Sequence, residues 1–158
     1  MYKGLNESQQ KEISDYCNRA LTHLYLPKEN YNYKLNNHED VEFRKNFDKQ
    51  RPTPYGGSNP GYYAYYDECK AILIDADDYL INIDNDSVWK IKVLHEVRHA
   101  YQYKQIELLE NNKTCDEQKE VILSWKKDFE FKKINGANMF NVTELDANKY
   151  SSLNWDKF

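Results

Sequence analysis

His95-Glu96-Val97-Arg98-His99 lies inside residues 88–109, a segment whose apolar spacing predicts one long α-helix. Residues four apart on a helix lie one turn apart on the same face, so both imidazoles can reach one metal ion. Glu96, beside the first histidine, can polarise a metal-bound water as a general base. The stretch therefore predicts a long helix that carries a metal site and around which the rest of the chain folds.

Upstream of this helix, the sequence predicts one amphipathic helix and a small sheet. Asn6 and Gln9 form a capping-box pattern for a helix that ends before Pro27. Alternating or β-prone residues predict strands at 31–35, 62–66, 71–74 and 79–83, the middle two pairing as a hairpin. A short helix is predicted at 39–47, and the proline- and glycine-rich residues 51–61 are predicted to form a loop.

Capping signals divide the rest of the chain into three helices. Ser87 is the predicted cap of the motif helix, and Thr114 with Glu117 forms a capping-box pattern for a helix that ends near Asn135-Gly136. Asn141 with Glu144 opens a last helix through about residue 152. The order of elements predicts a single α+β domain over residues 1–158, with a small antiparallel sheet, an active-site helix and flanking helices.

The composition bounds the function classes. The chain has 158 residues, 40% of them hydrophobic, and a net charge of −4, which gives no electrostatic reason to bind nucleic acid. The lysines at 126–127 and 132–133 alternate with acidic residues and are predicted to lie on a solvated helix face. With no membrane-length apolar stretch and no export signal, we expect no membrane association and a cytoplasmic protein. Three widely spaced cysteines predict neither a disulfide framework nor a cysteine zinc site.

Two histidines do not complete a catalytic zinc site, which needs a third protein ligand. The metzincin spacing would require glycine at 102 and histidine at 105, but both positions are glutamine. Downstream, Glu144 and Asn148 share one face of a predicted helix, whereas Asp146 points away from it. We therefore predict Glu144 as the third ligand, with Asp146 as the alternative, and Asn148 as a side chain that orients a ligand imidazole.

These segments together resemble the gluzincin branch of zinc metallopeptidases, and most closely the small bacterial and phage metallopeptidases of the ImmA/IrrE type. The corresponding segments are Gly61-Tyr62-Tyr63, residues 71–74, the HExxH motif at 95–99 and the Glu-x-Asp-Ala-Asn segment from residue 144. Two features depart from the family pattern. Arg98 stands where glycine is usual, and the two metal-binding segments are further apart than is typical.

The resemblance implies a zincin-like fold and a Zn²⁺-dependent peptidase acting on a peptide or protein substrate. His95, His99 and Glu144 would hold the metal and Glu96 would be the catalytic base. An extended peptide could add to one of the two hairpin strands. The donor that stabilises the oxyanion is left open among three candidates, Tyr150, Tyr103 and Arg98. The alternative is a catalytically inactive zincin-fold module with a binding or regulatory role in a phage, toxin or mobile-element system.

Overall fold

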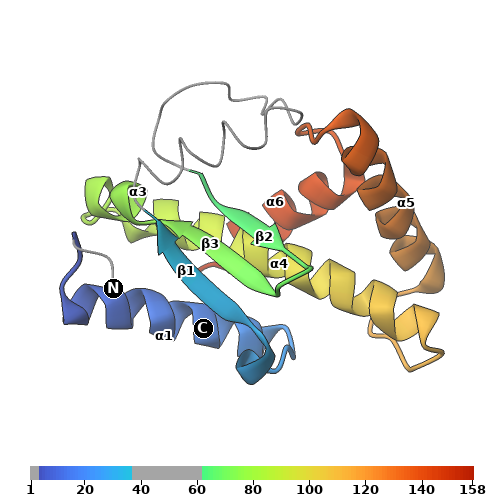
Figure 1. Ribbon diagram of the computed structural model, residues 1–158, viewed down its shortest axis with the longest axis horizontal. Helices are drawn as coiled ribbons and strands as arrows, with labels where there is room; N and C mark the ends of the chain where they lie inside the picture. Colours follow the sequence, from blue (N-terminus) through green and yellow to red (C-terminus); the bar gives the residue numbers. More distant parts are fainter. Residues whose placement is uncertain (1–3, 37–61) are drawn as a thin grey trace.

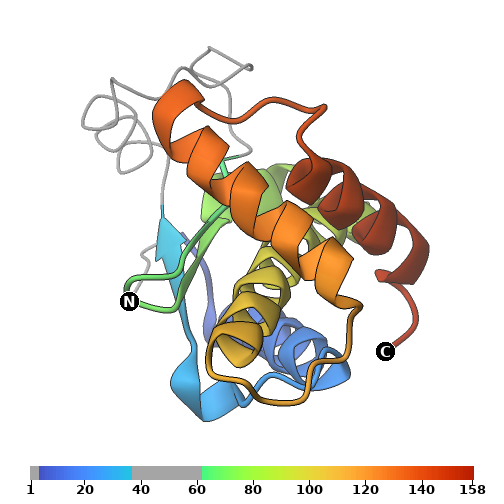
Figure 2. The same ribbon diagram turned by 90° about the vertical axis from the view of Figure 1, so that its right-hand side faces the viewer.

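The computed structural model describes residues 4–36 and 62–158, in which one long helix, α4 (Asp86–Glu110), forms the centre (Figure 1). The other elements, in chain order, are α1 (Glu7–His23), the 3-10 turn η1 (Lys28–Asn30), β1 (Asn32–Asn36), β2 (Ala64–Tyr66), β3 (Ala71–Asp75), α3 (Ala76–Ile81), α5 (Lys119–Asn135) and α6 (Val142–Asn154). Figure 2 views α4 nearly along its axis, with the sheet on one side of it and α6 on the other. The predicted α+β class is confirmed. The helix predicted at 39–47 and the loop predicted at 51–61 lie outside the described residues.

The three described strands form a mixed sheet in the order β1-β3-β2. The predicted hairpin is confirmed, since β2 runs antiparallel to β3. The prediction of a wholly antiparallel sheet is wrong, because β1 pairs with β3 in parallel. Side-chain periodicity gives the faces of a strand but not its direction, which depends on the path of the chain between strands. All five residues of β3 are buried, as expected for the central strand, whereas β2 lies at an edge of the described sheet.

Residues 79–83 do not form the predicted strand, because residues from Ala76 to Ile81 belong to α3. The Asp75 carboxylate, at the end of β3, accepts hydrogen bonds from the backbone N–H groups of Asp77 and Asp78 at 3.0 and 3.1 Å. Such a cap satisfies donors that an incipient helix leaves open, and acidic residues in the first turn favour the helix dipole. This local capping outweighs the β-propensity of residues 79–83.

The capping box at the start of α1 is confirmed. The Gln9 N–H donates to the Asn6 side chain at 2.8 Å, and the Asn6 N–H donates to the Gln9 side chain at 3.0 Å. The predicted Ser87 cap is wrong, because α4 already begins at Asp86 and the Ser87 hydroxyl donates to the Asn85 side chain instead.

The box predicted at Thr114 and Glu117 is also wrong, since α5 begins at Lys119. The backbone N–H groups of residues 116 and 117 instead donate to the buried Gln105 side chain on α4. The predicted end of this helix is confirmed at Gly136, whose φ of 76° suits a residue without a Cβ.

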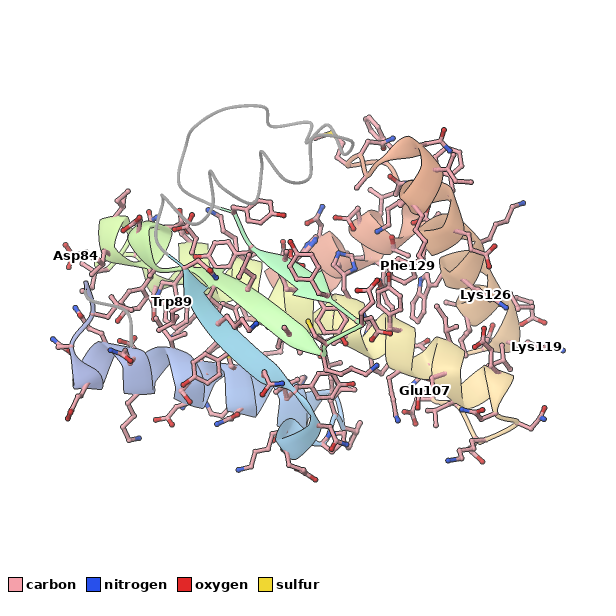
Figure 3. The ribbon with its side chains drawn as sticks, in the orientation of Figure 1. Asp84, Trp89, Glu107, Lys119, Lys126 and Phe129 are labelled. Carbon is pink, nitrogen blue, oxygen red and sulfur yellow. The ribbon has the colours of Figure 1, made fainter. Side chains whose placement is uncertain are left out.

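The side of α4 that faces α1 and α3 holds a large part of the apolar core, which continues to α5. Trp89, labelled in Figure 3, is fully buried. It packs edge to face with Tyr16 of α1 and Tyr79 of α3, at ring-centroid distances of 5.4 and 5.2 Å. The Tyr16 hydroxyl donates to the backbone carbonyl of Trp155 at 2.9 Å, which fixes the end of α6 against α1. Among the described helices, none is both long and apolar enough to cross a membrane.

Candidate metal centre

The structure brings the three predicted metal ligands together at the contact between α4 and α6. The Nε2 atoms of His95 and His99 lie 3.1 Å apart. The Glu144 carboxylate, 49 residues from His95 in the chain, lies 3.2 Å from the His95 Nε2 and 2.8 Å from the His99 Nε2. Helical spacing explains the first of these distances, and the packing of α6 on α4 explains the other two.

These distances suit a bound cation. Three ligand atoms on a tetrahedron with bonds of about 2.0–2.1 Å lie about 3.3 Å from one another, close to the separations among these side chains. A carboxylate oxygen and an unprotonated imidazole nitrogen both present lone pairs, so they approach this closely only with a proton or a metal ion between them. Two imidazoles and one carboxylate form a donor set of the kind that binds catalytic zinc.

The close approach of these side chains shifts the pKa values of Glu144 and His95. Burial acts to raise the pKa of Glu144, but its hydrogen bonds with His95 and His99 outweigh burial and hold the pKa well below its usual value. Burial acts to lower the pKa of His95, but the hydrogen bond with Glu144 and the charges of Glu96 and Glu144 raise it overall. In the metal-free protein, the carboxylates therefore favour a proton on the His95 imidazole. A bound metal ion would balance the same negative charges in place of that proton.

Glu96, the predicted catalytic base, lies beside the ligands. Its Oε1 is 3.9 Å from the His95 Nε2, and its side chain is 12% exposed. Potential ligand atoms of His95, Glu96 and His99 lie within 4.8 Å of one another. Burial raises the pKa of Glu96, although the neighbouring histidines act in the opposite direction. A carboxylate at this separation can contact a water bound at the centre.

The two other acidic and amide positions predicted on α6 differ in what they contact. The Asn148 side chain lies close enough to His95 to contribute to the raised pKa of its imidazole, and the orienting role of Asn148 stays a prediction. Asp146, the alternative ligand, instead accepts hydrogen bonds from the Arg98 Nε at 2.8 Å and from the Gln102 side chain at 2.8 Å. The geometry therefore favours Glu144 over Asp146 as the third ligand.

The three candidate oxyanion donors lie in two places. The Arg98 guanidinium, bound to Asp146, lies over the rings of Tyr101 and Tyr150, at 4.4 Å from each ring centroid. Tyr103 lines a cleft that also includes His99. Tyr103 therefore shares a cleft with His99, one of the predicted ligands.

This cleft has a volume of about 180 Å³ and lies between the β2–β3 hairpin and α5. Its aromatic wall continues from Tyr65 to Tyr103 and on to Phe129, with the last two rings stacked 4.0 Å apart. Lys132 and Lys133 add positive charge to the lining. The cleft therefore combines an apolar wall with a charged rim next to the candidate metal centre.

Sequence reasoning missed Lys132, which was predicted to be solvated. Its Nζ lies 2.9 Å from the Glu144 Oε2 and 4.6 Å from the ring centroid of Phe129, and its side chain is 13% exposed. The signal was present in the helical spacing, because Lys132 follows the buried Trp125 and Phe129 at i+7 and i+3.

Comparisons of the chain with protein-family models, with curated proteins and with solved structures found no match.

Proposed function

We propose that the protein is a zinc-dependent hydrolase, a metallopeptidase with a zincin-like site. His95, His99 and Glu144 hold Zn²⁺, and Glu96 is the general base. The observation that carries this proposal is the approach of three lone-pair-bearing side chains to within 2.8–3.2 Å of one another. Burying such groups together without a proton or a metal ion between them is unfavourable, and a metal ion at this point would satisfy all three side chains at once.

Different residues of the protein would have different roles in the reaction. Bound zinc supplies Lewis-acid chemistry. Glu96 takes a proton from the attacking water and delivers it to the amine that leaves, while Asn148 keeps the His95 ring in place. Tyr103, on the wall of the adjoining cleft, is the favoured donor to the developing oxyanion.

A peptide or protein substrate fits the surroundings of the site. Because β3 is the central strand, strand addition to residues 71–74 is excluded, and β2 is the strand of the hairpin that lies at an edge of the described sheet. The aromatic cleft between β2 and α5 lies beside His99 and can receive a side chain of an extended peptide. We retain the cytoplasm as the proposed compartment.

One observation favours the second candidate, a binding or regulatory module without catalysis. The Lys132 ammonium already supplies a positive charge 2.9 Å from the Glu144 Oε2. Glu144 thus has a cationic partner from the protein itself, so its charge is compensated in the folded state without any metal. Metal content separates the two candidates.

The metal is tested by elemental analysis of protein loaded with zinc and then freed of excess metal. We expect one zinc per chain in the wild type and a loss of zinc in His99→Ala and Glu144→Ala. His23→Ala is the matched control, because His23 lies on α1 and stacks on Phe158 at 4.9 Å. A wild type without zinc, or full zinc retention in both site variants, would overturn the proposed centre.

Catalysis is tested with a peptide library and with folded protein substrates. Glu96→Gln should abolish cleavage, by at least about 100-fold, while zinc remains bound. Glu107→Gln makes the same change on an exposed position of the same helix and should leave cleavage intact. A zinc-loaded wild type that cleaves no member of either set would support the binding module instead.

A further inference from the structure

Gln102 is a fully buried glutamine of α4 whose side-chain amide makes three hydrogen bonds. Its Oε1 lies 2.8 Å from the His99 Nδ1, and its Nε2 donates to the Thr143 carbonyl at 3.0 Å and to the Asp146 carboxylate at 2.8 Å. A primary amide offers two N–H donors and one carbonyl oxygen. Both N–H groups and the oxygen of Gln102 therefore have partners.

The partners fix which way this amide points. A backbone carbonyl and an ionised carboxylate can only accept, so the NH₂ group of Gln102 must face Thr143 and Asp146. Its oxygen must then face His99, and an oxygen can only accept. The His99 Nδ1 consequently carries the proton that it donates to Gln102, and the Nε2 is the atom left for a metal ion.

The same amide also positions α6. Thr143 and Asp146 lie on either side of Glu144 in the chain, in the first part of that helix. By binding both, Gln102 holds the turn that carries the third ligand against the helix that carries the other two. One buried side chain thus contacts one predicted ligand and the segment that presents another.

We propose that Gln102 is the positioning residue of the metal centre: it keeps the His99 imidazole with Nε2 toward the metal and holds the α6 turn so that Glu144 reaches the same point. The inference rests on the proposed function, in which His99 and Glu144 bind zinc. Outer hydrogen bonds of this kind orient ligands and influence metal affinity without contacting the metal.

Gln105 provides a matched control on the same helix. It is 1% exposed, and its side chain also makes three hydrogen bonds, to Asp116 and to the backbone N–H groups of residues 116 and 117. Gln102→Met and Gln105→Met both remove a buried amide of equal size from α4. We expect similar losses of stability, but only Gln102→Met should weaken zinc binding, by about 10- to 100-fold, in competition with a chelator.

A spectroscopic measurement separates positioning from mere stability. In zinc-loaded protein labelled with ¹⁵N-histidine, wild type and Gln105→Met should show His99 coordinated through Nε2, with a slowly exchanging proton on Nδ1. In Gln102→Met, that proton should exchange rapidly or the ring should coordinate through Nδ1. Gln102→Asn, whose shorter amide cannot reach His99 and α6 together, should behave like Gln102→Met if the methionine variant does not fold.

The outcomes distinguish this inference from the proposed function. If the wild type binds zinc but its His99 coordinates through Nδ1, or if Gln102→Met retains both the affinity and the Nδ1 signal, the positioning role is overturned and the zinc site stands. If the wild type binds no zinc under any loading condition, both proposals are overturned. Equal loss of affinity in Gln102→Met and Gln105→Met would also contradict the positioning role.

Discussion

On the side of α4 that faces α1 and α3, the buried residues are apolar, whereas the side that faces α6 buries histidine, arginine and glutamine. Trp89 on the first side is fully buried and belongs to the hydrophobic core cluster. Arg98, His99 and Gln102 on the second side are 8%, 7% and 0% exposed and are linked by hydrogen bonds that include Asp146. One helix therefore carries both the hydrophobic core and a polar network.

The two sides of α4 differ in how strictly each buried side chain depends on particular partners. Apolar packing is non-directional and gains stability roughly in proportion to the area removed from water. A buried polar group gains little net stability when it is paired and loses much when its partner is removed. We therefore expect substitutions on the apolar side to act on stability alone, and substitutions on the α6 side to act on metal binding as well.

The largest expected effect is that of Trp89→Ala. Removing a fully buried indole should lower the free energy of unfolding by about 4 kcal/mol, because a large cavity remains between α1, α3 and α4. Zinc per folded chain should stay at the wild-type value. Urea denaturation measures the free energy of unfolding, and elemental analysis measures the zinc content. The control is Trp155→Ala, which removes a half-buried indole. Loss of zinc from folded Trp89→Ala would mean that the two sides of α4 are not separable.

Zinc bound at the proposed centre between α4 and α6 should itself stabilise the folded protein. At a free zinc concentration 100 times the dissociation constant, the free energy of unfolding should rise by about 2.7 kcal/mol. Thermal unfolding with and without the metal measures this gain. The gain should be absent in Glu144→Ala and unchanged in Trp89→Ala, since distant sites act additively. An equal gain in Glu144→Ala would place the metal elsewhere.

Arg98→Met tests the ion pair that joins α4 to α6. We expect a loss of about 2 kcal/mol, below the range for fully buried pairs because the Asp146 side chain is 28% exposed. Chemical denaturation gives the stability, and zinc affinity should fall less than in Gln102→Met. Lys104→Met, which removes an exposed contact with Glu107 at 3.5 Å, is the control and should change little. An Arg98→Met variant with the stability of the wild type would show that the hydrogen bond from Gln102 is sufficient for Asp146.

The smallest effect concerns Cys17, on the apolar side, whose pKa is raised by burial to about 12. The unfolded thiol ionises near pH 8.5, so the folded state is fully favoured below that pH and loses stability as the pH rises toward 12. At pH 9.5 this loss amounts to about 1 kcal/mol. Cys17→Ala should show a correspondingly shallower decline in unfolding free energy from pH 7 to 9.5, whereas the exposed Cys69→Ala should match the wild type. Parallel pH profiles for all three proteins would contradict the assigned burial.

Local signals in the sequence predicted much of the fold. The Asn6–Gln9 capping box, the β2–β3 hairpin and the length of the motif helix depend on residues close together in the chain, and all three are confirmed. The errors arose where local signals competed or distant residues intervened. Asp75 caps α3 against the β-propensity of residues 79–83. Gln105 accepts hydrogen bonds from the backbone N–H groups of residues 116 and 117, where the residue types Thr114 and Glu117 had suggested a capping box.

The sequence by itself determined that His95 and His99 can meet, because a spacing of four on a helix sets their distance. It also indicated Glu144, through its shared helix face with Asn148. Only the tertiary structure decided that Asp146 binds Arg98, that Lys132 reaches Glu144 and that Gln102 joins His99 to α6. The reason is physical: helical periodicity is a property of adjacent residues, whereas the partner of a buried polar atom depends on how α4, α5 and α6 pack.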